Sequence, residues 1–415
     1  MPLSYLSKSP GIGGAIKSAP EDFLVEEIGT DGTVFEIDKP FSEPDEPGGA
    51  RPGRFVHFIL QKKDWSTSSA ISEIAKRLRT THRMFNVAGN KDKTAITTQL
   101  VSASGIRKED VLSLDVKDMK INGAWTESER VHMGALLGNR FTIRVRDAVG
   151  SGDSGEKDSS VSRSRSEAVV SELKRSFPNY FGEQRFGSSR KNTYQIGVKL
   201  LKGEIEEAVR SFLFDSEGET HIEAKLARKE LEESGNYASA MNTFPRHLRL
   251  ERSMIAHLAK KHDDFSGALR ELPRNNLLMF IHAVQSHLFN RSLSDRIGEG
   301  ELELERGEYF CGESSGFPDI SKAEAEGWIT AKLIGYQTNL NEREKELLGE
   351  LGLEKESFRM KSLPEINSKG SYRTLLAPMK DFNLSVDTSI VFRFSLPSGS
   401  YATVAMREFM KNDGN

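Results

Sequence analysis

The segment 88–99 carries the pattern that most directly suggests chemistry. It reads A-G-N-K-D-K-T-A-I-T-T-Q, so Asp92 stands between Lys91 and Lys93. A short apolar run ends just before it, which predicts a strand followed by a loop, and Gly89 permits a turn that other residues resist. A carboxylate at the end of a strand, among cations, is suited to act as a nucleophile or a base. The same residues also fit a solvated surface turn, and local chemistry alone favours that interpretation.

Several elements that would position this loop are predicted from local patterns. A Ser/Thr cluster at 66–69 precedes apolar residues at helical spacing, which predicts a capped helix that leads to the Asp92 strand. Short strands are expected at 23–25 and 34–35, around an Asp-Gly turn. Near the C-terminus a period of two predicts a strand with Ile390, Phe392, Phe394 and Leu396 on one face, followed by a short helix.

The middle of the chain has a different character. Residues 42–53 form a Pro/Gly-rich stretch that we predict to be a loop, and residues 149–166 are of low complexity and expected to be mobile. From about 200 to 365 the apolar residues recur at helical spacing. A helix-rich block between strand-bearing segments predicts an α+β fold with an insertion.

Composition limits the class of protein. The chain has 415 residues, of which 37% are hydrophobic and 29% charged, which fits a soluble protein with several folded units. Cys311 is the only cysteine, which excludes an internal disulfide framework and suits a reducing cytoplasm. The nine histidines include no H-x-x-x-H pair. No apolar run approaches the length of a membrane span and no signal peptide is evident, so we expect a cytoplasmic protein.

The net charge of −3 gives no global argument for a nucleic-acid partner, but the cations are unevenly placed. Between Ile74 and Lys93 there are six Lys or Arg residues and one acid. Such a local basic surface is able to hold phosphates, although ordinary solvated helix faces explain it equally well. The candidate RNA contacts are Lys76, Arg77, Arg79, Lys91, Lys93, Arg185, Arg190 and Lys191.

Five segments in order resemble the TruD family of tRNA pseudouridine synthases. The first is the G-x-K-D-x-x-A-x-T-x-Q pattern around Asp92. The others are K-x-x-P-E-D-F at 17–23, the N-Y-F-G segment at 179–182, Q-S-x-x-F-N at 285–290 and L-P-S-G at 396–399. Together they span almost the whole chain, which reverses the preference for a plain surface turn at Asp92.

The resemblance implies a fold and an organisation. It implies an α+β fold with a pseudouridine-synthase-like catalytic core, built on a mixed, largely antiparallel sheet, and a helix-rich α/β insertion domain. We expect the core to consist of residues 1–204 and 367–415, with the insertion at 205–366. The implied activity is that of an isomerase (an intramolecular transferase) that converts one uridine of tRNA, at position 13, to pseudouridine. We expect a monomer with tRNA as partner, no membrane association and no cofactor or metal.

The resemblance also implies roles for individual residues. Asp92 would either attack C1′ of the target nucleotide or remove the C2′ proton, and the sequence does not choose between these. Phe181 and Asn179 would hold the target base, although a core aromatic and an Asn turn are the common roles of such residues. Lys17 would pair with Asp92 or hold a phosphate. Two further residues are expected beside the nucleotide, with a plain core role as the alternative: Phe23 and Leu396.

Two other functions fit the same residues. The chain would serve as an RNA-binding or RNA-chaperone protein on this scaffold if catalysis were secondary. A nucleosidase that releases free base is a weaker alternative, because such sites usually need a positioned water and a second carboxylate.

Overall fold

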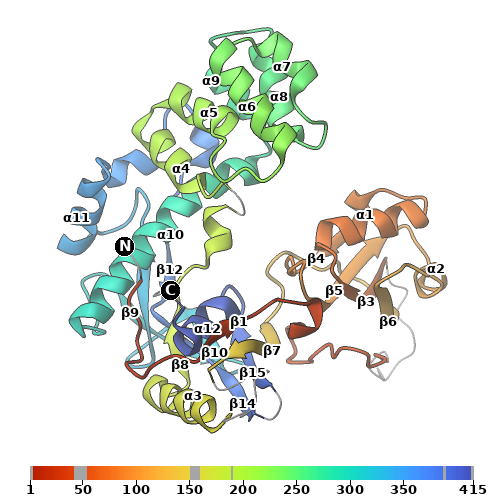
Figure 1. Cartoon of the computed structure of the whole chain (residues 1–415), viewed down its shortest axis with the longest axis vertical. Helices are drawn as coiled ribbons and strands as arrows, with labels where there is room; N and C mark the ends of the chain where they lie inside the picture. The colour runs from red at the N-terminus through yellow and green to blue at the C-terminus, as the bar shows by residue number, and fades with distance from the viewer. Residues whose placement is uncertain (1–2, 42–53, 150–158, 188–189, 387–388, 413–415) are drawn as a thin grey trace. The chain divides into compact units, whose positions relative to one another are not determined.

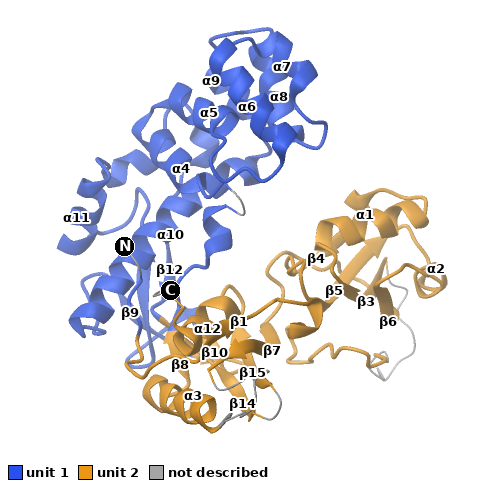
Figure 2. Cartoon of the chain, viewed as in Figure 1, with its two compact units in different colours: residues 1–5, 178–312, 319–375 blue, residues 6–177, 313–318, 376–415 orange. Residues whose placement is uncertain are grey.

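The computed structural model describes residues 3–41, 54–149, 159–187, 190–386 and 389–412. The chain divides into two compact units (Figure 2). Unit 1 contains residues 1–5, 178–312 and 319–375, and unit 2 contains residues 6–177, 313–318 and 376–415. Each unit is described by itself below.

Unit 2 is built on a mixed sheet (Figure 1). Within the described residues nine strands form this sheet, in the order β14-β15-β7-β2-β5-β3-β6, with β1 beside β7 and β4 beside β5. Among the described residues β2 and β5 form a parallel pair and the other paired strands of this sheet are antiparallel, so the largely antiparallel sheet of our prediction is confirmed. The strands are β1 (Gly13–Ala15), β2 (Phe23–Ile28), β3 (Phe55–Lys63), β4 (Phe85–Val87), β5 (Ile96–Ser104), β6 (Met119–Glu127), β7 (Gly138–Ala148), β14 (Lys380–Val386) and β15 (Ile390–Pro397).

Helices cover parts of this sheet. Helix α1 (Thr67–Arg77) packs Ile71 and Ile74 against the strand residues Phe58 and Val101 in one apolar cluster. Its predicted cap is confirmed, because the Ser66 side chain accepts a hydrogen bond from the Ser69 amide at 3.1 Å. The other helices of this unit are α2 (Lys108–Leu112), α3 (Ser159–Leu173) and α12 (Ala402–Met410).

The C-terminal strand and helix form as predicted. Ile390, Phe392, Phe394 and Leu396 of β15 are all at most 2% exposed. Phe409 of α12 lies against Phe392, with ring centroids 4.8 Å apart. Alternation therefore decides which face of β15 is buried, and the following helix covers that face.

The prediction of a mobile segment at 149–166 is wrong where the structure describes it. Helix α3 includes Ser160–Ser166, and Ser162 and Ser166 are fully buried. The Arg165 guanidinium donates to the Gly11 carbonyl at 2.8 Å, so tertiary contacts stabilise a stretch whose composition alone favours disorder. The remainder of that segment, and the predicted loop at 42–53, lie outside the described residues.

Unit 1 is helix-rich, and the 26-residue helix α10 (Arg274–Glu299) runs through it. Apolar side chains of α10 share one cluster with the surrounding helices: Leu277, Phe280, Ile281, Val284 and Leu288. A smaller sheet, ordered β10-β9-β11-β12, continues from it. The elements are α4 (Thr193–Lys202), α5 (Ile205–Phe214), α6 (Ile222–Ser234), α7 (Tyr237–Thr243), α8 (Arg249–Leu258), α9 (Phe265–Arg270), α11 (Glu342–Glu350), β9 (Tyr309–Ser314), β10 (Phe317–Glu324), β11 (Trp328–Leu333) and β12 (Ser371–Thr374).

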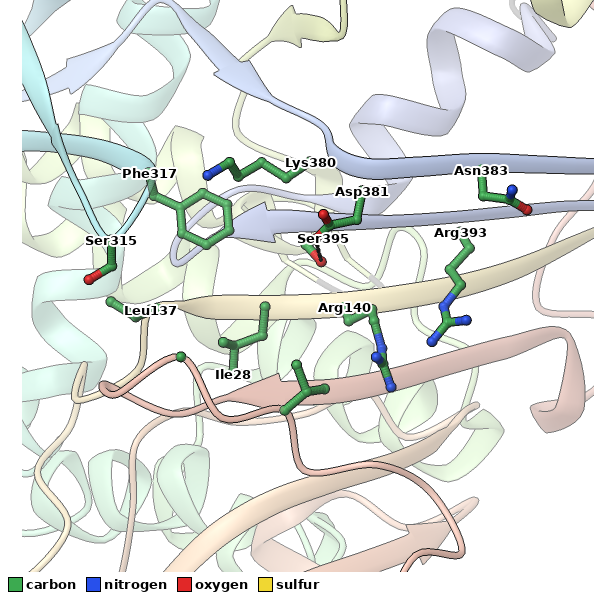
Figure 3. A pocket seen from close by; sticks show the side chains of 12 residues that line it. Ile28, Leu137, Arg140, Ser315, Phe317, Lys380, Asp381, Asn383, Arg393 and Ser395 are labelled. Carbon is green, nitrogen blue, oxygen red and sulfur yellow. Dashed lines mark hydrogen bonds between the residues drawn. The ribbon is translucent and has the colours of Figure 1, made fainter.

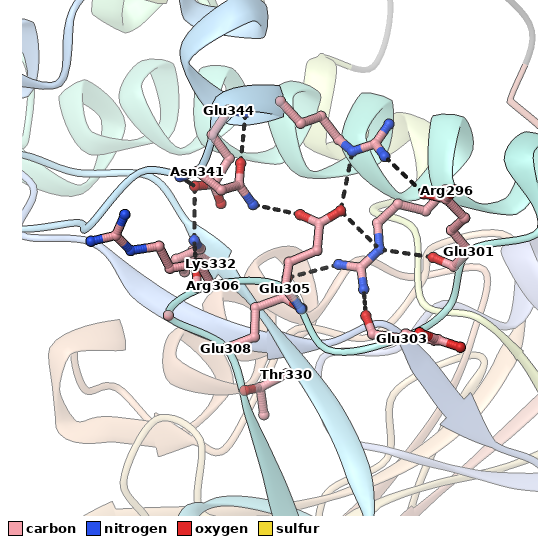
Figure 4. A network of polar contacts seen from close by, with 12 residues as sticks. Arg296, Glu301, Glu303, Glu305, Arg306, Glu308, Thr330, Lys332, Asn341 and Glu344 are labelled. Atoms are coloured by element: carbon pink, nitrogen blue, oxygen red, sulfur yellow. Dashed lines mark hydrogen bonds and ion pairs between the residues drawn. The ribbon is translucent and has the colours of Figure 1, made fainter.

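A buried polar network ties the end of α10 to the segment that leads into β9 (Figure 4). Arg296 is fully buried, and its guanidinium donates to Glu308 at 2.7 Å and to the Glu301 carbonyl at 3.3 Å. Lys332 of β11 pairs with Glu344 of α11 at 2.9 Å. Buried charges need such partners, since an unpaired buried charge costs several kcal/mol. The network therefore stabilises one conformation of the segment between α10 and β9.

The packing divides the chain at other points than the predicted domain limits of 204/205 and 366/367. Helix α4 precedes the predicted insertion, yet its Ile196 and Leu200 belong to the apolar cluster of α10. The units change at 177/178 and 375/376 instead, because the buried face of α4 finds its partner in unit 1. The predicted functional domains stay a prediction.

Candidate active site

The loop between β4 and β5 presents Asp92 beside Lys17. The Lys17 ammonium lies 3.3 Å from the Asp92 carboxylate, and both side chains are about a quarter exposed or less. The same ammonium lies over the Phe23 ring, 4.1 Å from its centroid. Three residues predicted for the site are thus brought together within unit 2. A partly exposed ion pair of this kind holds a carboxylate in place while solvent and ligand still reach it.

Buried partners hold the other residues of the motif. The Lys91 ammonium is buried against Glu27 at 2.5 Å, and Glu27 also accepts from the Leu100 amide at 3.0 Å. The Thr67 hydroxyl accepts from the Lys91 amide at 2.9 Å and donates to Gln99 at 2.9 Å. The motif residues therefore hold the loop by hydrogen bonds and ion pairs, and Asp92 is its partly exposed acid.

Gly89 has a different role from the one we predicted. It is not among the glycines of positive φ, and an added Cβ would meet only the Lys91 ammonium, at 3.9 Å. Gln99 donates to the Gly89 carbonyl at 3.2 Å, so the backbone of this residue, rather than its conformational freedom, joins the loop to β5.

Lys62 is a residue of this site that the sequence did not reveal. It is fully buried at the end of β3, and its ammonium donates to the carbonyls of Trp65, at 2.6 Å, and of Asp92, at 2.8 Å. Burial lowers the pKa of Lys62 from 10.5 to about 8, against the attraction of the Asp92 carboxylate. Lys62 lies thirty positions from Asp92 in a strand of ordinary appearance, so no local signal identifies it.

Phe23 and Leu396 occupy core positions. Phe23 is 1% exposed and packs edge-to-face on Phe141, with centroids 6.0 Å apart. Leu396 is fully buried on β15. Both side chains lie on the apolar face of the sheet, so the plain core role describes them, and their contacts with a nucleotide stay predictions.

Asn179 and Phe181 lie in unit 1, and both side chains contact Arg373. The Asn179 amide donates to the Thr374 carbonyl at 3.1 Å, and its side-chain oxygen accepts from Arg373 at 2.6 Å. The Phe181 backbone exchanges hydrogen bonds of 2.8 and 2.9 Å with the Asn290 amide group. Asn290, from the Q-S-x-x-F-N segment, thereby fixes the N-Y-F-G segment.

Arg373 is a second residue that the sequence did not reveal. Its guanidinium lies over the Phe181 ring, 4.1 Å from the centroid, and it also bonds Asn179. One arginine thus orients both residues that are predicted to hold the base. It stands in the undistinguished stretch S-Y-R-T, far from 179–182 in sequence, so only the tertiary structure connects them.

The predicted RNA contacts divide into exposed and occupied cations. Lys76, Arg77, Arg79 and Lys93 are exposed, as is Lys191, which pairs with Glu183 at 3.0 Å. The buried Lys91 and the largely buried Arg190 are held by Glu27 and Glu251 respectively, which argues against phosphate contacts for these two. Arg185 is half-buried and lies over the Phe181 ring at 5.2 Å.

The arrangement consists of a mixed sheet and a loop that holds Asp92 beside Lys17, and comparison with known proteins identifies the family. The family model described as tRNA pseudouridine synthase D (TruD) matches residues 3–409. The chain belongs to this family.

Individual relatives agree along the whole chain. A protein of Thermococcus sibiricus named “Probable tRNA pseudouridine synthase D” is 34% identical, with 98% of this chain and 97% of that protein covered. A protein of Pyrococcus furiosus with the same name is also 34% identical, over 99% and 98%. A crystal structure described as the “Putative tRNA pseudouridine synthase D (TruD)” of Methanosarcina mazei superposes with a TM-score of 0.74 at 30% identity, covering 98% of this chain and 96% of that one. The α+β fold of our prediction is confirmed.

Proposed function

We propose that this protein isomerises the uridine at position 13 of tRNA to pseudouridine, with Asp92 as the reacting carboxylate. Family membership gives the reaction class, which is uridine-to-pseudouridine isomerisation in tRNA. The observation that carries the role of Asp92 is its placement. It is the acid of the motif loop, paired with Lys17 at 3.3 Å, while Lys91 beside it is buried and bonded to Glu27 and Thr67.

The reaction rearranges one nucleotide. The N1–C1′ bond breaks, the uracil turns, a C5–C1′ bond forms, C5 loses its proton and N1 gains one. Loss of the N1–C1′ bond leaves C1′ electron-poor, as in glycoside hydrolysis. A carboxylate beside the ribose either adds to C1′ or takes the C2′ proton, and both routes start from the same placement of Asp92. Lys17 holds that carboxylate in one orientation, and Lys62 fixes the backbone that carries it.

The test is Asp92→Asn. The amide has nearly the same shape but is a far weaker nucleophile and base, so pseudouridine formation at single turnover should vanish while the melting temperature and tRNA binding are kept. Asp92→Glu should also fail, because the longer side chain displaces the carboxylate by about one bond. Glu21→Gln is the matched control, since Glu21 is a half-exposed acid that pairs with Lys63 nearby. Substantial isomerisation by a folded Asp92→Asn protein would refute the role, and free uracil among the products would indicate a nucleosidase.

We further propose a cytoplasmic monomer that needs neither metal nor coenzyme. The reaction involves no net oxidation and no net hydrolysis, so the bonds that break and form lie within one substrate. No helix in the described part of the chain is long and apolar enough to cross a membrane. Light scattering of the purified protein tests the monomer, and full activity after dialysis against a chelator tests the metal independence.

A further inference from the structure

A hollow of about 540 Å³ lies on unit 2, and none of the residues that line it belongs to the Asp92 loop (Figure 3). Arg140 on β7 is opposite Ser395 on β15, and Thr142 is opposite Arg393, so Arg140 and Arg393 share one face of the sheet. Phe23 and Leu396 occupy the alternate positions and lie on the other face. The hollow is therefore a site separate from the residues so far discussed.

The tip of the β9–β10 hairpin, residues 313–318, belongs to unit 2 and closes one end of the hollow. Ser315 and Gly316 connect β9 to β10 and have φ values of +50° and +79°, as a two-residue type I′ turn requires. The next residue, Phe317, lines the hollow, and the Lys380 ammonium lies 5.3 Å from the centroid of its ring. An added Cβ at Gly316 would collide with that ammonium, so the glycine leaves room for Lys380 along the tip.

The charges around the hollow are not balanced. Arg140 pairs with Glu26 at 2.6 Å and with Glu36 at 2.8 Å, and Glu36 also pairs with Lys39, so these two cations and two carboxylates balance. Burial opposes its charge, but these hydrogen bonds raise the pKa of Arg140, so it is a fixed part of the wall. Within the described ranges, no carboxylate lies within 4.0 Å of the charged groups of Lys380 or Arg393.

One acid stands in the same hollow. Asp381 accepts a hydrogen bond from the Ser395 hydroxyl at 3.3 Å. It offsets one of the two remaining cations, which leaves the hollow positively charged. Asn383 and Ser315 add an amide and a hydroxyl to the lining.

We propose that this hollow binds a phosphate group through Lys380 and Arg393. A guanidinium offers two parallel donors to phosphate oxygens, an ammonium offers a compact charge, and hydroxyl and amide groups complete such sites. The phosphate belongs either to a phosphodiester of the tRNA, which rests on the proposed function, or to a free nucleotide. Both sources present the same oxygens to the same two side chains.

The first experiment measures tRNA binding by Lys380→Gln/Arg393→Gln. The double variant should bind tRNA about tenfold more weakly or worse at low salt, because two charge-assisted contacts are lost. The slope of log affinity against log salt should decrease by about one for each lost contact. The control is Lys108→Gln/Lys117→Gln, which removes two cations from the same unit outside the hollow and should leave the slope close to that of the wild type.

Asp381→Asn gives an effect of the opposite sign. Removing the carboxylate beside the two cations should strengthen binding of a phosphate ligand by several-fold, whereas loss of a merely structural residue would weaken it or leave it unchanged. A melting curve of each variant separates folding from binding.

The second experiment separates the two sources. Calorimetric titrations with inorganic phosphate and with uridine 5′-monophosphate test the free ligands. Loss of tRNA affinity in the double variant supports the phosphodiester, and loss of nucleotide binding alone supports the free ligand. Unchanged binding of tRNA, phosphate and nucleotide would overturn the proposal. Pseudouridine formation at saturating tRNA should stay unchanged in the double variant, so failure at the hollow is distinguishable from failure of the Asp92 chemistry.

Discussion

Replacing Lys62 by methionine should slow pseudouridine formation while the protein stays folded. The Lys62 ammonium joins the carbonyls of Trp65 and Asp92 beneath the reactive loop, at 2.6 and 2.8 Å. Methionine keeps a similar length and an apolar stem but supplies no donor. The backbone of Asp92 therefore loses a fixed point, while the apolar packing of β3 is kept.

The magnitudes separate the effect on stability from the effect on catalysis. A pKa lowered from 10.5 to about 8 means that burying the ammonium costs about 3 kcal/mol, which methionine removes. Two buried carbonyls then lack that donor, at about 1–3 kcal/mol each. These terms oppose one another, so the free energy of unfolding should change by no more than about 3 kcal/mol. A displacement of the reacting group by about 1 Å costs about 100-fold in rate, so we expect the rate to decrease by about 10- to 100-fold.

The assay is single-turnover pseudouridine formation at saturating tRNA, run beside a melting curve. Lys63→Met is the matched control, since Lys63 is the next residue on β3, points to the opposite face and pairs with the half-exposed Glu21. It should retain a rate close to that of the wild type. A folded Lys62→Met protein with a rate within twofold of the wild type would refute the bracing role, as would an equal loss in Lys63→Met.

Three further predictions concern the pH dependence of stability, the Phe181 ring and the exposed cations of α1. The contribution of Lys62 to the free energy of unfolding should rise between about pH 8 and 10.5, because in that window the unfolded state binds the Lys62 proton and the folded state has released it. The difference in melting temperature between the wild type and Lys62→Met, measured against pH, tests this. A difference that does not change with pH contradicts it. Phe181→Ala should lose activity, because about 1–3 kcal/mol of stacking on the target base is lost, whereas Phe181→Tyr should keep part of the activity. If Phe181→Ala unfolds and Phe181→Tyr is folded but inactive, Phe181 has only a core role. The third change replaces three exposed cations of α1 and the following turn by Glu: Lys76, Arg77 and Arg79. This variant should bind tRNA more weakly and with a smaller salt dependence, while its melting temperature stays the same. Unchanged tRNA affinity would exclude this patch as an RNA contact.

The sequence alone determined the elements whose signals are local. The cap at Ser66 and the spacing of Ile71 and Ile74 define α1, because a helix end and its buried face are set by residues within a few positions. The alternation of β15 likewise predicts its buried face. The motif around Asp92 and the four other matching segments, one of which begins at Lys17, indicated the correct family, since five ordered segments carry more information than any one of them.

Composition failed where tertiary contacts decided the outcome. The Ser-rich stretch within α3 is helical because Ser162 and Ser166 are buried and Arg165 bonds Gly11, and none of these contacts is visible in its composition. The packing of α4 also depends on tertiary contacts, because its apolar face packs on the distant helix α10 as well as on the adjacent α5, and the predicted domain limits stay a prediction.

Only the tertiary structure decided which side chains meet at the sites. Lys62 contacts Asp92, and Arg373 contacts Phe181, across separations that no period or motif records. The pairing of Lys91 with Glu27 turned a candidate phosphate ligand into a buried brace. Lys380 and Arg393 share a hollow because β14 and β15 are adjacent in the sheet. Sequence patterns report which way a side chain faces on its own element, whereas its partners depend on how distant elements pack, and that is a property of the folded chain.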